Sequence, residues 1–355
     1  MTAPAQPAIA FDDLKVDALL VSALPNIRYL TGFNGDNALL LLTPDSTTLV
    51  TDPRFTIQAS EECSCQVRVA VKGPLELVAS ELIRRKRLKR IGFEATRLIY
   101  SGYRRLKQAL PLGASLKPLD PVIEKLRMIK SEAEIASIRQ SVSTNSKAFA
   151  NAVRSIRPGL TEAALAARLD FEMRRLGAEK PAFDTIVAAG PRSALPHARP
   201  TSKKILKDEL LLIDMGACQD GYMSDMTRVL FLGRPSGRVR RMYDTVAKAQ
   251  LAAIDAVREG ATTGQVDRRA RQVLESEGLG KAFVHSTGHG LGLEIHEPPR
   301  VGKHDKTRLQ AGMVITIEPG AYIRGFGGIR IEDTVLVTKS GCEVLTPTSK
   351  ELRLL

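Results

Sequence analysis

Ile213-Asp214-Met215-Gly216 and Ser224-Asp225-Met226-Thr227 are the two segments around which this chain is organised, and they are typical of the arms of a β-hairpin. The apolar runs Leu210–Ile213 and Val229–Leu232 have the composition of strands. Asp220-Gly221 between them is a strong two-residue hairpin signal. The pattern therefore predicts two paired strands that carry aspartates near their adjoining ends.

Strand alternation decides whether these two aspartates can meet. If Gln219 pairs with Tyr222, Asp214 lies opposite Thr227, and Asp225 is the next residue on the same face. Diagonal neighbours of this kind are about 7–8 Å apart at the backbone, so their carboxylates can converge on one cation. Two solvated aspartates are an equally good interpretation of the hairpin alone, and residues further along the chain decide between the two.

The composition is that of an ordinary globular protein. A chain of 355 residues predicts two domains, and its 43% apolar and 26% charged residues lie in the usual range. No apolar run approaches bilayer-spanning length, and Met1–Ala10 lacks the features of a secretory leader, so we expect a cytoplasmic protein without membrane association. The four cysteines do not suggest a disulfide framework, and Cys63 and Cys65 lack the usual zinc or redox spacing.

The formal charge of +13 raises the question of nucleic-acid binding. Its densest run, Arg84–Arg90, has no nearby aromatic residue that could stack on a base. Leu77, Leu82 and Ile83 precede it at roughly helical spacing, so the run is interpreted as the solvated end of an amphipathic helix, where basic residues complement the helix dipole. Nucleic acid is therefore not an expected partner.

The first part of the chain is predicted to be a small α/β domain, assigned to residues 1–124. Strands are expected at Ala18–Ala23, Ala38–Leu42, Thr47–Thr51, Gln66–Val71 and Arg90–Phe93, and helices at Pro53–Glu61, Leu75–Arg85 and Ser101–Leu110. Nothing in this region has the spacing of a catalytic site. The prolines and glycine between Pro111 and Pro121 are interpreted as a linker.

The second domain, residues 125–355, is predicted to be an internally duplicated α+β fold. Ser131 and Glu134 form a capping-box signature for a helix that ends near Ser155. Further helices are expected from Thr161 to Gly177 and from Ser236 to Arg258, and another is expected to end near Gly278. Gly159–Gly177 and Gly260–Gly278 span the same interval of 18 residues, which suggests two helix–helix–strand units related by a pseudo-two-fold axis. Such a duplication places a cleft between the halves.

Three histidines fall within twelve residues of one another. His285, His289 and His296 are interleaved with glycines in Val284–His296. The Gly-x-Gly-x-Gly run there lacks the helix and the acidic residue of a dinucleotide fingerprint, and it favours a strand or loop whose backbone approaches another segment closely. A single histidine is more often structural, but this grouping favours a functional site. His197 follows Pro196 in a separate loop.

Two carboxylates follow in predicted strands. Glu318 ends the apolar run Met313–Ile317, and Glu332 lies in the predicted strand Gly328–Val335, on one face with Arg330. A carboxylate in an otherwise apolar strand is costly to bury unless it is paired or binds a metal. A simple surface pair of Arg330 with Glu332 is the alternative.

The two hairpin aspartates, one of the histidines and the two strand glutamates together suggest a metal centre rather than five separate structural roles. The set is too acidic for a structural zinc site and suits harder divalent ions such as Mn²⁺ or Co²⁺, with Zn²⁺ as the alternative. Two ions about 3.5–4 Å apart can share a hydroxide and activate it at neutral pH, which makes hydrolysis the natural reaction class. The set comprises Asp214, Asp225, His289, Glu318 and Glu332.

At these residues the chain closely resembles the Xaa-Pro peptidases, prolidase and aminopeptidase P, of the methionine aminopeptidase/creatinase superfamily with its pita-bread fold. The segments that carry the resemblance are Ile213–Gly216, Ser224–Thr227, His285–Gly292, Glu318–Gly320 and Arg330–Asp333. Ala23–Phe33 and Thr51–Arg54 resemble the creatinase-type N-terminal domain, which usually serves dimerisation and covers the cleft mouth. The resemblance thus covers nearly the whole chain and implies a homodimer.

The resemblance implies a role for each metal ligand. Asp214 would chelate one ion, and Asp225 and Glu332 would bridge both. His289 and Glu318 would complete the other coordination sphere. Glu318 would also be the general base toward a bridging hydroxide that attacks the Xaa-Pro bond of dipeptides or short peptides.

The resemblance also assigns residues around the metals. His197, His285 and His296 would bind the substrate and stabilise the tetrahedral intermediate, and Arg330 would orient neighbouring groups. Arg300 occupies the position of a prolidase arginine that pairs with the carboxylate of a dipeptide. Short bacterial chains of this type act on dipeptides or on longer Xaa-Pro-Yaa peptides, so Arg300 favours the dipeptidase without excluding the aminopeptidase.

Two other functions are consistent with the fold. A methionine-aminopeptidase-like specificity would leave the whole N-terminal domain without a purpose. A non-catalytic pita-bread module that binds a partner or RNA would fit the basic charge, but such proteins have typically lost metal ligands, and all five positions are filled here. The metal content of the purified protein distinguishes that module from the peptidase.

Overall fold

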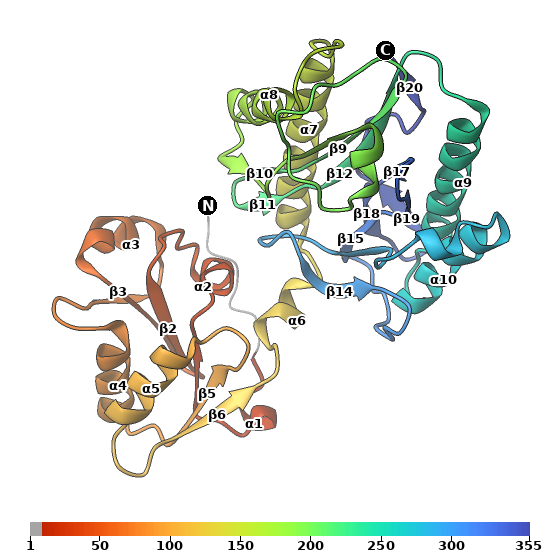
Figure 1. Ribbon diagram of the computed structural model, residues 1–355. Helices are drawn as coiled ribbons and strands as arrows, with labels where there is room; N and C mark the ends of the chain where they lie inside the picture. Colours follow the sequence, from red (N-terminus) through yellow and green to blue (C-terminus); the bar gives the residue numbers. More distant parts are fainter. Residues whose placement is uncertain (1–8) are drawn as a thin grey trace. The chain divides into compact units, whose positions relative to one another are not determined.

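The computed structural model describes residues 9–355 and divides the chain into two compact units, Met1–Arg127 and Met128–Leu355. Figure 1 shows that each unit has its own sheet and helices. The predicted two-domain α/β architecture is confirmed. Within the described residues no helix is both long and apolar enough to cross a membrane.

Unit 1 is built on one six-stranded mixed sheet. Its strands lie in the order β4-β3-β2-β1-β5-β6. The central strand β1 runs antiparallel to β2 and parallel to β5. The strands are β1 (Ala18–Val21), β2 (Ala38–Thr43), β3 (Ser46–Thr51), β4 (Gln66–Val69), β5 (Arg90–Glu94) and β6 (Ser115–Leu119).

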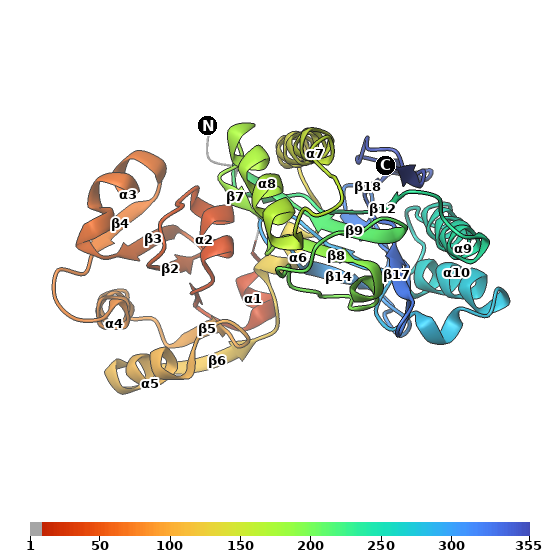
Figure 2. The same cartoon turned by 45° about the horizontal axis from the view of Figure 1, so that its top comes forward.

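Helices cover both faces of this sheet, because alternate strand residues are apolar on each side (Figure 2). One face packs on α4 (Leu75–Arg85) and α5 (Tyr100–Ala109), through Ile83 and Leu106 among others. The other face packs on α2 (Leu24–Thr31), α3 (Thr56–Glu62) and α6 (Ile123–Arg127). A single helical turn, α1 (Phe11–Leu14), precedes β1, and the 3-10 turn η1 (Pro53–Phe55) precedes α3.

Three predictions for unit 1 were wrong, the first being the strand expected over Gln66–Val71, which ends at Val69. The strand expected to reach Ala23 ends at Val21, and the helix α2 follows directly, with Pro25 in its first turn. The region interpreted as a linker contains β6, which pairs in parallel with β5. Pro118 is tolerated there because β6 is the edge strand of the sheet.

Unit 2 contains two pairs of long helices at opposite flanks of its strands (Figures 1 and 2). Ser131 and Glu134 form the predicted capping box of the first helix. Thr161, Ser236 and Thr262 cap the other three with their side-chain hydroxyls. The helices are α7 (Glu132–Val153), α8 (Glu162–Arg175), α9 (Gly237–Ile254) and α10 (Thr263–Ser276).

The strands of unit 2 form two principal sheets between these helix pairs. The four-stranded sheet has the order β20-β12-β9-β8, with strands β8 (Ile186–Ala189), β9 (Glu209–Met215), β12 (Met226–Leu232) and β20 (Arg353–Leu354). The five-stranded sheet has the order β14-β13-β15-β18-β19, with strands β13 (Gly288–Gly290), β14 (Glu297–Val301), β15 (Val314–Ile317), β18 (Asp333–Val337) and β19 (Cys342–Val344). Smaller sheets pair β16 (Gly320–Ile323) with β17 (Gly327–Arg330), and β10 (Ala217–Gln219) with β11 (Tyr222–Met223) and β7 (Lys180–Pro181).

The predicted internal duplication is visible in matching hydrogen bonds. Ahead of α8, the amide of Gly159 donates to the carbonyl of Ile205, and ahead of α10 the amide of Gly260 donates to Leu309 in the same way. Isolated antiparallel β-bridges occur at equivalent places in the two halves, between Thr161 and Lys204 and between Thr262 and Arg308. Both glycines have positive φ, as a sharp turn into each helix requires. Each half therefore repeats the same helix–helix–strand unit.

Candidate metal centre

The central hairpin has the predicted register. Gln219 pairs with Tyr222, and Asp214 lies opposite Thr227. The hairpin is interrupted between β10–β11 and β9–β12, so Asp225 lies just outside regular strand structure, before β12. A β-carbon at Gly216 would lie 2.0 Å from the carbonyl oxygen of Ser224, so only glycine fits opposite this break.

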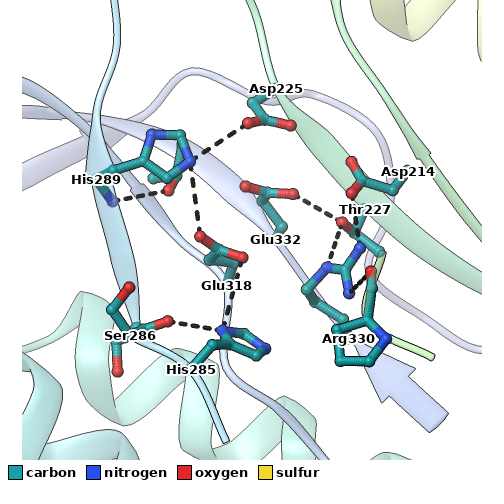
Figure 3. A network of polar contacts seen from close by, with 12 residues as sticks. Asp214, Asp225, Thr227, His285, Ser286, His289, Glu318, Arg330 and Glu332 are labelled. Carbon is teal, nitrogen blue, oxygen red and sulfur yellow. Dashed lines mark hydrogen bonds and ion pairs between the residues drawn. The ribbon is translucent and has the colours of Figure 1, made fainter. Parts of the chain in front are cut away.

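The five side chains predicted to bind metal come together, two from the first half of unit 2 and three from the second (Figure 3). They lie at or next to the ends of strands: Asp214 on β9, Asp225 before β12, His289 on β13, Glu318 after β15 and Glu332 before β18. Asp225, His289 and Glu332 offer ligand atoms within 4.8 Å of one another. The geometry is that of a compact cluster of metal-ligating groups.

His289 lies between two of the carboxylates. Its Nε2 is 3.5 Å from Asp225 Oδ2 and 3.6 Å from Glu318 Oε1. Its Nδ1 is 3.0 Å from the Gly290 carbonyl, so the proton belongs on Nδ1 and the lone pair of Nε2 faces the carboxylates. Burial lowers the pKa of His289 to about 4, which keeps the ring neutral, as a metal ligand must be.

Asp214 and Glu332 are held by a second group of contacts. Arg330 Nη2 donates to Asp214 Oδ2 at 2.6 Å, and Arg330 Nε donates to the hydroxyl of Thr227 at 3.0 Å. That hydroxyl in turn donates to Glu332 Oε2 at 2.7 Å. Thr227 thus links the guanidinium to a carboxylate that the guanidinium does not touch directly. The proposed surface pair of Arg330 with Glu332 is excluded, since both residues are buried.

Oxygen atoms without partners test whether this cluster fits a cation. Over residues 9–355, Asp214 Oδ1 and Asp225 Oδ1 are buried and accept no hydrogen bond. A buried carboxylate oxygen without a partner is costly unless a cation neutralises it. The donor set, four carboxylates and one imidazole, suits hard or borderline divalent ions. The residues present therefore fit a divalent metal centre.

Burial and mutual repulsion both disfavour charge on the carboxylates of the cluster. Burial raises the pKa of Asp225 well above its usual range, and neighbouring Glu332 and Asp214 raise it further. Burial also raises the pKa of Glu332, with Glu318 and Asp214 adding to the effect. The pKa of Glu318 rises to about 8, chiefly through burial. Bound cations would reverse this electrostatic balance.

Tyr322 is a site residue that the sequence did not reveal. Its hydroxyl is 2.8 Å from His285 Nε2 and accepts from Arg330 Nη1 at 2.7 Å. His285 Nδ1 is 2.8 Å from the Ser286 carbonyl, so Nδ1 is the donor and Nε2 accepts from Tyr322. One signal was available in the sequence. Tyr322 lies in β16, a strand that begins two residues after Glu318, so its side chain could have been placed near the candidate site.

The predicted substrate residues line one cavity of about 880 Å³ together with the cluster. His197 and His296 are exposed on its wall, and the rings of His296 and His289 meet edge to face at 4.4 Å. Burial lowers the pKa of His285 to about 4 and also lowers the pKa of His296. Arg300 lies opposite His289 in the β13–β14 ladder, so both side chains belong to the same face of the sheet.

The glycines between the histidines have the close-approach role that the sequence predicted. A β-carbon at Gly288 would lie 1.9 Å from the Thr316 carbonyl oxygen, and one at Gly290 would lie 2.3 Å from that of Pro298. Strands β14 and β15 can flank β13 this tightly only because these positions lack side chains. The close packing fixes the backbone that carries His289.

The single strand predicted over Gly328–Val335 was wrong. β17 ends at Arg330 and pairs with β16, whereas β18 begins at Asp333 and pairs with β15. The chain changes sheets at Ile331–Glu332, so Glu332 lies outside both ladders. Arg228 holds this break in place, donating to the Glu332 carbonyl and, at 2.6 Å, to Asp333 Oδ1.

A duplicated α+β domain that gathers buried carboxylates and a neutral imidazole into one cavity defines a metal-dependent enzyme. The profile of Metallopeptidase family M24 matches residues 136–339, and that of the Creatinase/Prolidase N-terminal domain matches residues 9–129. The chain belongs to metallopeptidase family M24. The family and fold that the motifs indicated are confirmed.

Similar proteins match almost the entire chain. An Xaa-Pro dipeptidase from Pyrococcus horikoshii is 40% identical over 96% of this chain and 95% of its own. The solved structure of an Xaa-Pro dipeptidase from Bacillus anthracis matches with a TM-score of 0.94 and 36% identity, over 98% of this chain and 97% of that one. The structure of an X-Pro aminopeptidase from Thermotoga maritima matches with a TM-score of 0.90 and 36% identity, over 97% of this chain and 99% of that one.

Proposed function

We propose that this metallopeptidase hydrolyses the Xaa-Pro bond at the N-terminus of dipeptides or short peptides, using two divalent metal ions. The observation that carries the proposal is the buried cluster itself, in which Asp214 and Asp225 each retain an oxygen without a hydrogen-bond partner in the part of the chain described. The Xaa-Pro activities named for the Pyrococcus, Bacillus and Thermotoga proteins support the substrate class.

The chain's own residues would hold the ions in an asymmetric way. Asp214 would bind one ion, His289 and Glu318 the other, and Asp225 and Glu332 both. Mn²⁺ and Co²⁺ fit this oxygen-rich set best, and Zn²⁺ is the alternative. When bound, the ions would supply a water molecule acidified enough to act as a nucleophile near neutral pH, and a Lewis acid for the scissile carbonyl.

The remaining residues would move protons and stabilise charge. Glu318 would accept a proton from the attacking water and return it to the departing amine of proline. His285 is fixed in one tautomer between Ser286 and Tyr322, and one of its ring nitrogens lies 4.0 Å from Glu318 Oε2. His197 and His296 on the cavity wall would bind the peptide and stabilise the developing oxyanion.

Arg300 would decide how much peptide the site prefers after proline. Its place opposite His289 in the β13–β14 ladder directs it to the cavity that holds the cluster. There it would pair with a carboxylate that follows proline immediately, as in a dipeptide. The dipeptidase of Bacillus anthracis and the aminopeptidase of Thermotoga maritima are equally identical to this chain, so identity does not separate the two specificities.

Matched peptides test the activity and the role of Arg300 together. Metal-depleted protein should cleave neither Ala-Pro nor Ala-Pro-Ala, and added Mn²⁺ or Co²⁺ should restore cleavage. Arg300→Ala should lower kcat/KM on Ala-Pro about 10- to 100-fold, the range for one charged hydrogen bond, and change Ala-Pro-Ala much less. Lys303→Ala, at an exposed neighbour of the site, is the control and should change neither.

Two outcomes would count against the proposal. A metal-loaded protein that cleaves neither peptide is not an Xaa-Pro peptidase. A purified protein that binds no Mn²⁺, Co²⁺ or Zn²⁺ is not a metal-dependent enzyme. If Arg300→Ala lowers kcat/KM equally for both peptides, the protein is still a hydrolase but the proposed contact of Arg300 with the carboxylate is wrong.

We also propose that unit 1 mediates a homodimer, on the strength of the family resemblance. Light scattering of the purified full-length protein tests this directly. A monomer at concentrations of the activity assay would contradict it.

A further inference from the structure

Glu332, which the proposed function assigns as a shared metal ligand, has a backbone that β12 holds. The chain changes sheets at this residue, so it belongs to neither the β17 nor the β18 ladder. Its amide donates to the carbonyl of Thr227 at 3.2 Å, and its carbonyl accepts from Arg228 Nη1. The position of the Glu332 carboxylate therefore depends on how firmly the Arg228 guanidinium is itself held.

The C-terminal end of the chain, residues 345–355, holds that guanidinium, and we call it the C-terminal strap. Arg228 Nε donates to the Ser349 carbonyl at 3.0 Å, and Nη2 donates to the Thr348 carbonyl at 2.7 Å. The strap ends in β20, which pairs in parallel with β12, the strand that carries Arg228 (Figure 1). Two backbone carbonyls of the strap thus fix the direction in which the guanidinium points.

A lysine of the strap makes a second connection, to the residue that follows Glu332. Lys350 Nζ lies 2.6 Å from Asp333 Oδ2, and Arg228 Nη2 lies 2.6 Å from Oδ1 of the same carboxylate. Gln250 Nε2 on α9 also donates to Asp333 Oδ2, at 2.9 Å. The Asp333 side chain is completely buried, whereas that of Lys350 is 27% exposed. A buried carboxylate with three donors is a firm anchor, because each lost partner leaves part of its charge uncompensated.

We propose that the C-terminal strap is a positioning element of the metal centre, in which Lys350 fixes Asp333 and thereby sets the Glu332 carboxylate for metal binding. The inference rests on the proposed function, because it takes Glu332 as a metal ligand. Lys350 acts through Asp333 rather than on the metal, so it is a positioning residue.

An ion pair with a purely structural role would behave differently from a positioning contact. It would raise the stability of the metal-free fold and leave the affinity for metal unchanged. A positioning contact changes the affinity, and thermodynamic linkage then requires that bound metal also stabilise the strap against opening. The affinity and the opening of the strap are therefore the two quantities to measure.

Calorimetric titration of full-length, metal-depleted protein with Mn²⁺ measures the affinity. Groups that orient metal ligands directly change metal affinity about 10- to 100-fold when removed, and Lys350 acts one contact further away. Lys350→Met should therefore weaken Mn²⁺ binding about 5- to 20-fold. Lys350→Arg keeps the charge and should stay within about twofold of wild type. Lys339→Met, which removes an exposed lysine shortly after β18, is the matched control and should bind Mn²⁺ as wild type does.

Hydrogen exchange measures the opening of the strap and is independent of peptidase activity. The amides of Leu345 and Leu355 donate to the carbonyls of Thr334 and Phe231, so their exchange reports on this opening. Saturating Mn²⁺ should slow exchange in residues 345–355 of the wild-type protein at least about fivefold. The slowing should be smaller in Lys350→Met. Exchange in α4 of unit 1 should be the same with and without Mn²⁺.

Each failure has its own meaning. If Lys350→Met binds Mn²⁺ as tightly as wild type, the positioning role is overturned, even where the urea midpoint of the metal-free variant falls. Equal exchange in the wild-type strap with and without Mn²⁺ also overturns it, and this measurement needs no variant to fold. A wild-type protein that binds none of Mn²⁺, Co²⁺ and Zn²⁺ overturns the proposed metal dependence as well, which tells the two failures apart.

Discussion

Thr227→Val is the substitution that best isolates how the centre is organised. Thr227 is completely buried, and its hydroxyl accepts from Arg330 Nε at 3.0 Å and donates to Glu332 Oε2 at 2.7 Å. Valine has nearly the same shape but cannot make either bond. It therefore leaves one guanidinium N–H and one carboxylate oxygen without their partner, while the packing stays the same.

The size of the effect follows from these two contacts. A buried hydrogen bond to a charged group contributes about 1.5–3 kcal/mol. Removing one partner leaves the other group buried without a hydrogen bond, which destabilises the site by a similar amount. Groups that orient metal ligands typically change metal affinity about 10- to 100-fold when removed, or about 1.4–2.8 kcal/mol. We therefore expect Thr227→Val to weaken Mn²⁺ or Co²⁺ binding at least tenfold, and to lower kcat more than it raises KM.

Calorimetric titration of metal-depleted protein measures the affinity, and Thr227→Ser is the matched control. Serine keeps the hydroxyl and removes a methyl group, so Thr227→Ser should stay within about threefold of wild type in metal affinity. Urea unfolding with and without metal shows whether the loss belongs to the centre or to the whole fold. If Thr227→Val binds metal as tightly as wild type, the hydroxyl does not orient Glu332 and the reasoning fails.

Three further outcomes are expected. His289→Ala and Glu332→Ala should each reduce hydrolysis of Ala-Pro at least about 1,000-fold while near-ultraviolet circular dichroism stays native, and substantial residual activity would show the ligand assignment to be wrong. Gly288→Ala should destabilise the fold by at least about 3 kcal/mol in urea because its β-carbon would lie 1.9 Å from a carbonyl oxygen, whereas Gly341→Ala meets nothing within 4 Å and should be nearly neutral. Burial raises the pKa of Glu318 from 4.5 to about 8, so the metal-free fold binds more protons than the unfolded chain across that window. Its stability should therefore fall as the pH rises from about 4.5 to 8, and a flat urea midpoint would contradict this.

The sequence predicted the hairpin because its chemistry is local. The turn residues Asp220-Gly221 set the register, and the register alone determined that Asp214 faces Thr227. The Ser131–Glu134 capping box and the equal glycine intervals were readable for the same reason. Each of these features depends on residues close together in the chain.

The features that the sequence missed depend on distant contacts. Tyr322 gains its role only when Arg330 and His285 are brought to its hydroxyl. Glu332 leaves the predicted strand because β17 and β18 join different sheets, which no local pattern records. In unit 1, β6 lies in a proline-rich stretch that resembles a linker until β5 pairs with it. At Glu332 and in β6, strand pairing between distant parts of the chain overrode the local propensity.

The division of the centre between the two halves of unit 2 has a consequence for how the protein is made. Asp214 and Asp225 precede His289, Glu318 and Glu332 in the chain, so during synthesis the first half emerges with its hairpin carboxylates while the other ligands do not yet exist. Under the proposed ligand assignment, metal capture would have to wait until the second half has docked against the first. Occupancy of the centre would thus serve as a late checkpoint of assembly, and a nascent chain stalled before β13 should be unable to retain metal however well its hairpin has formed.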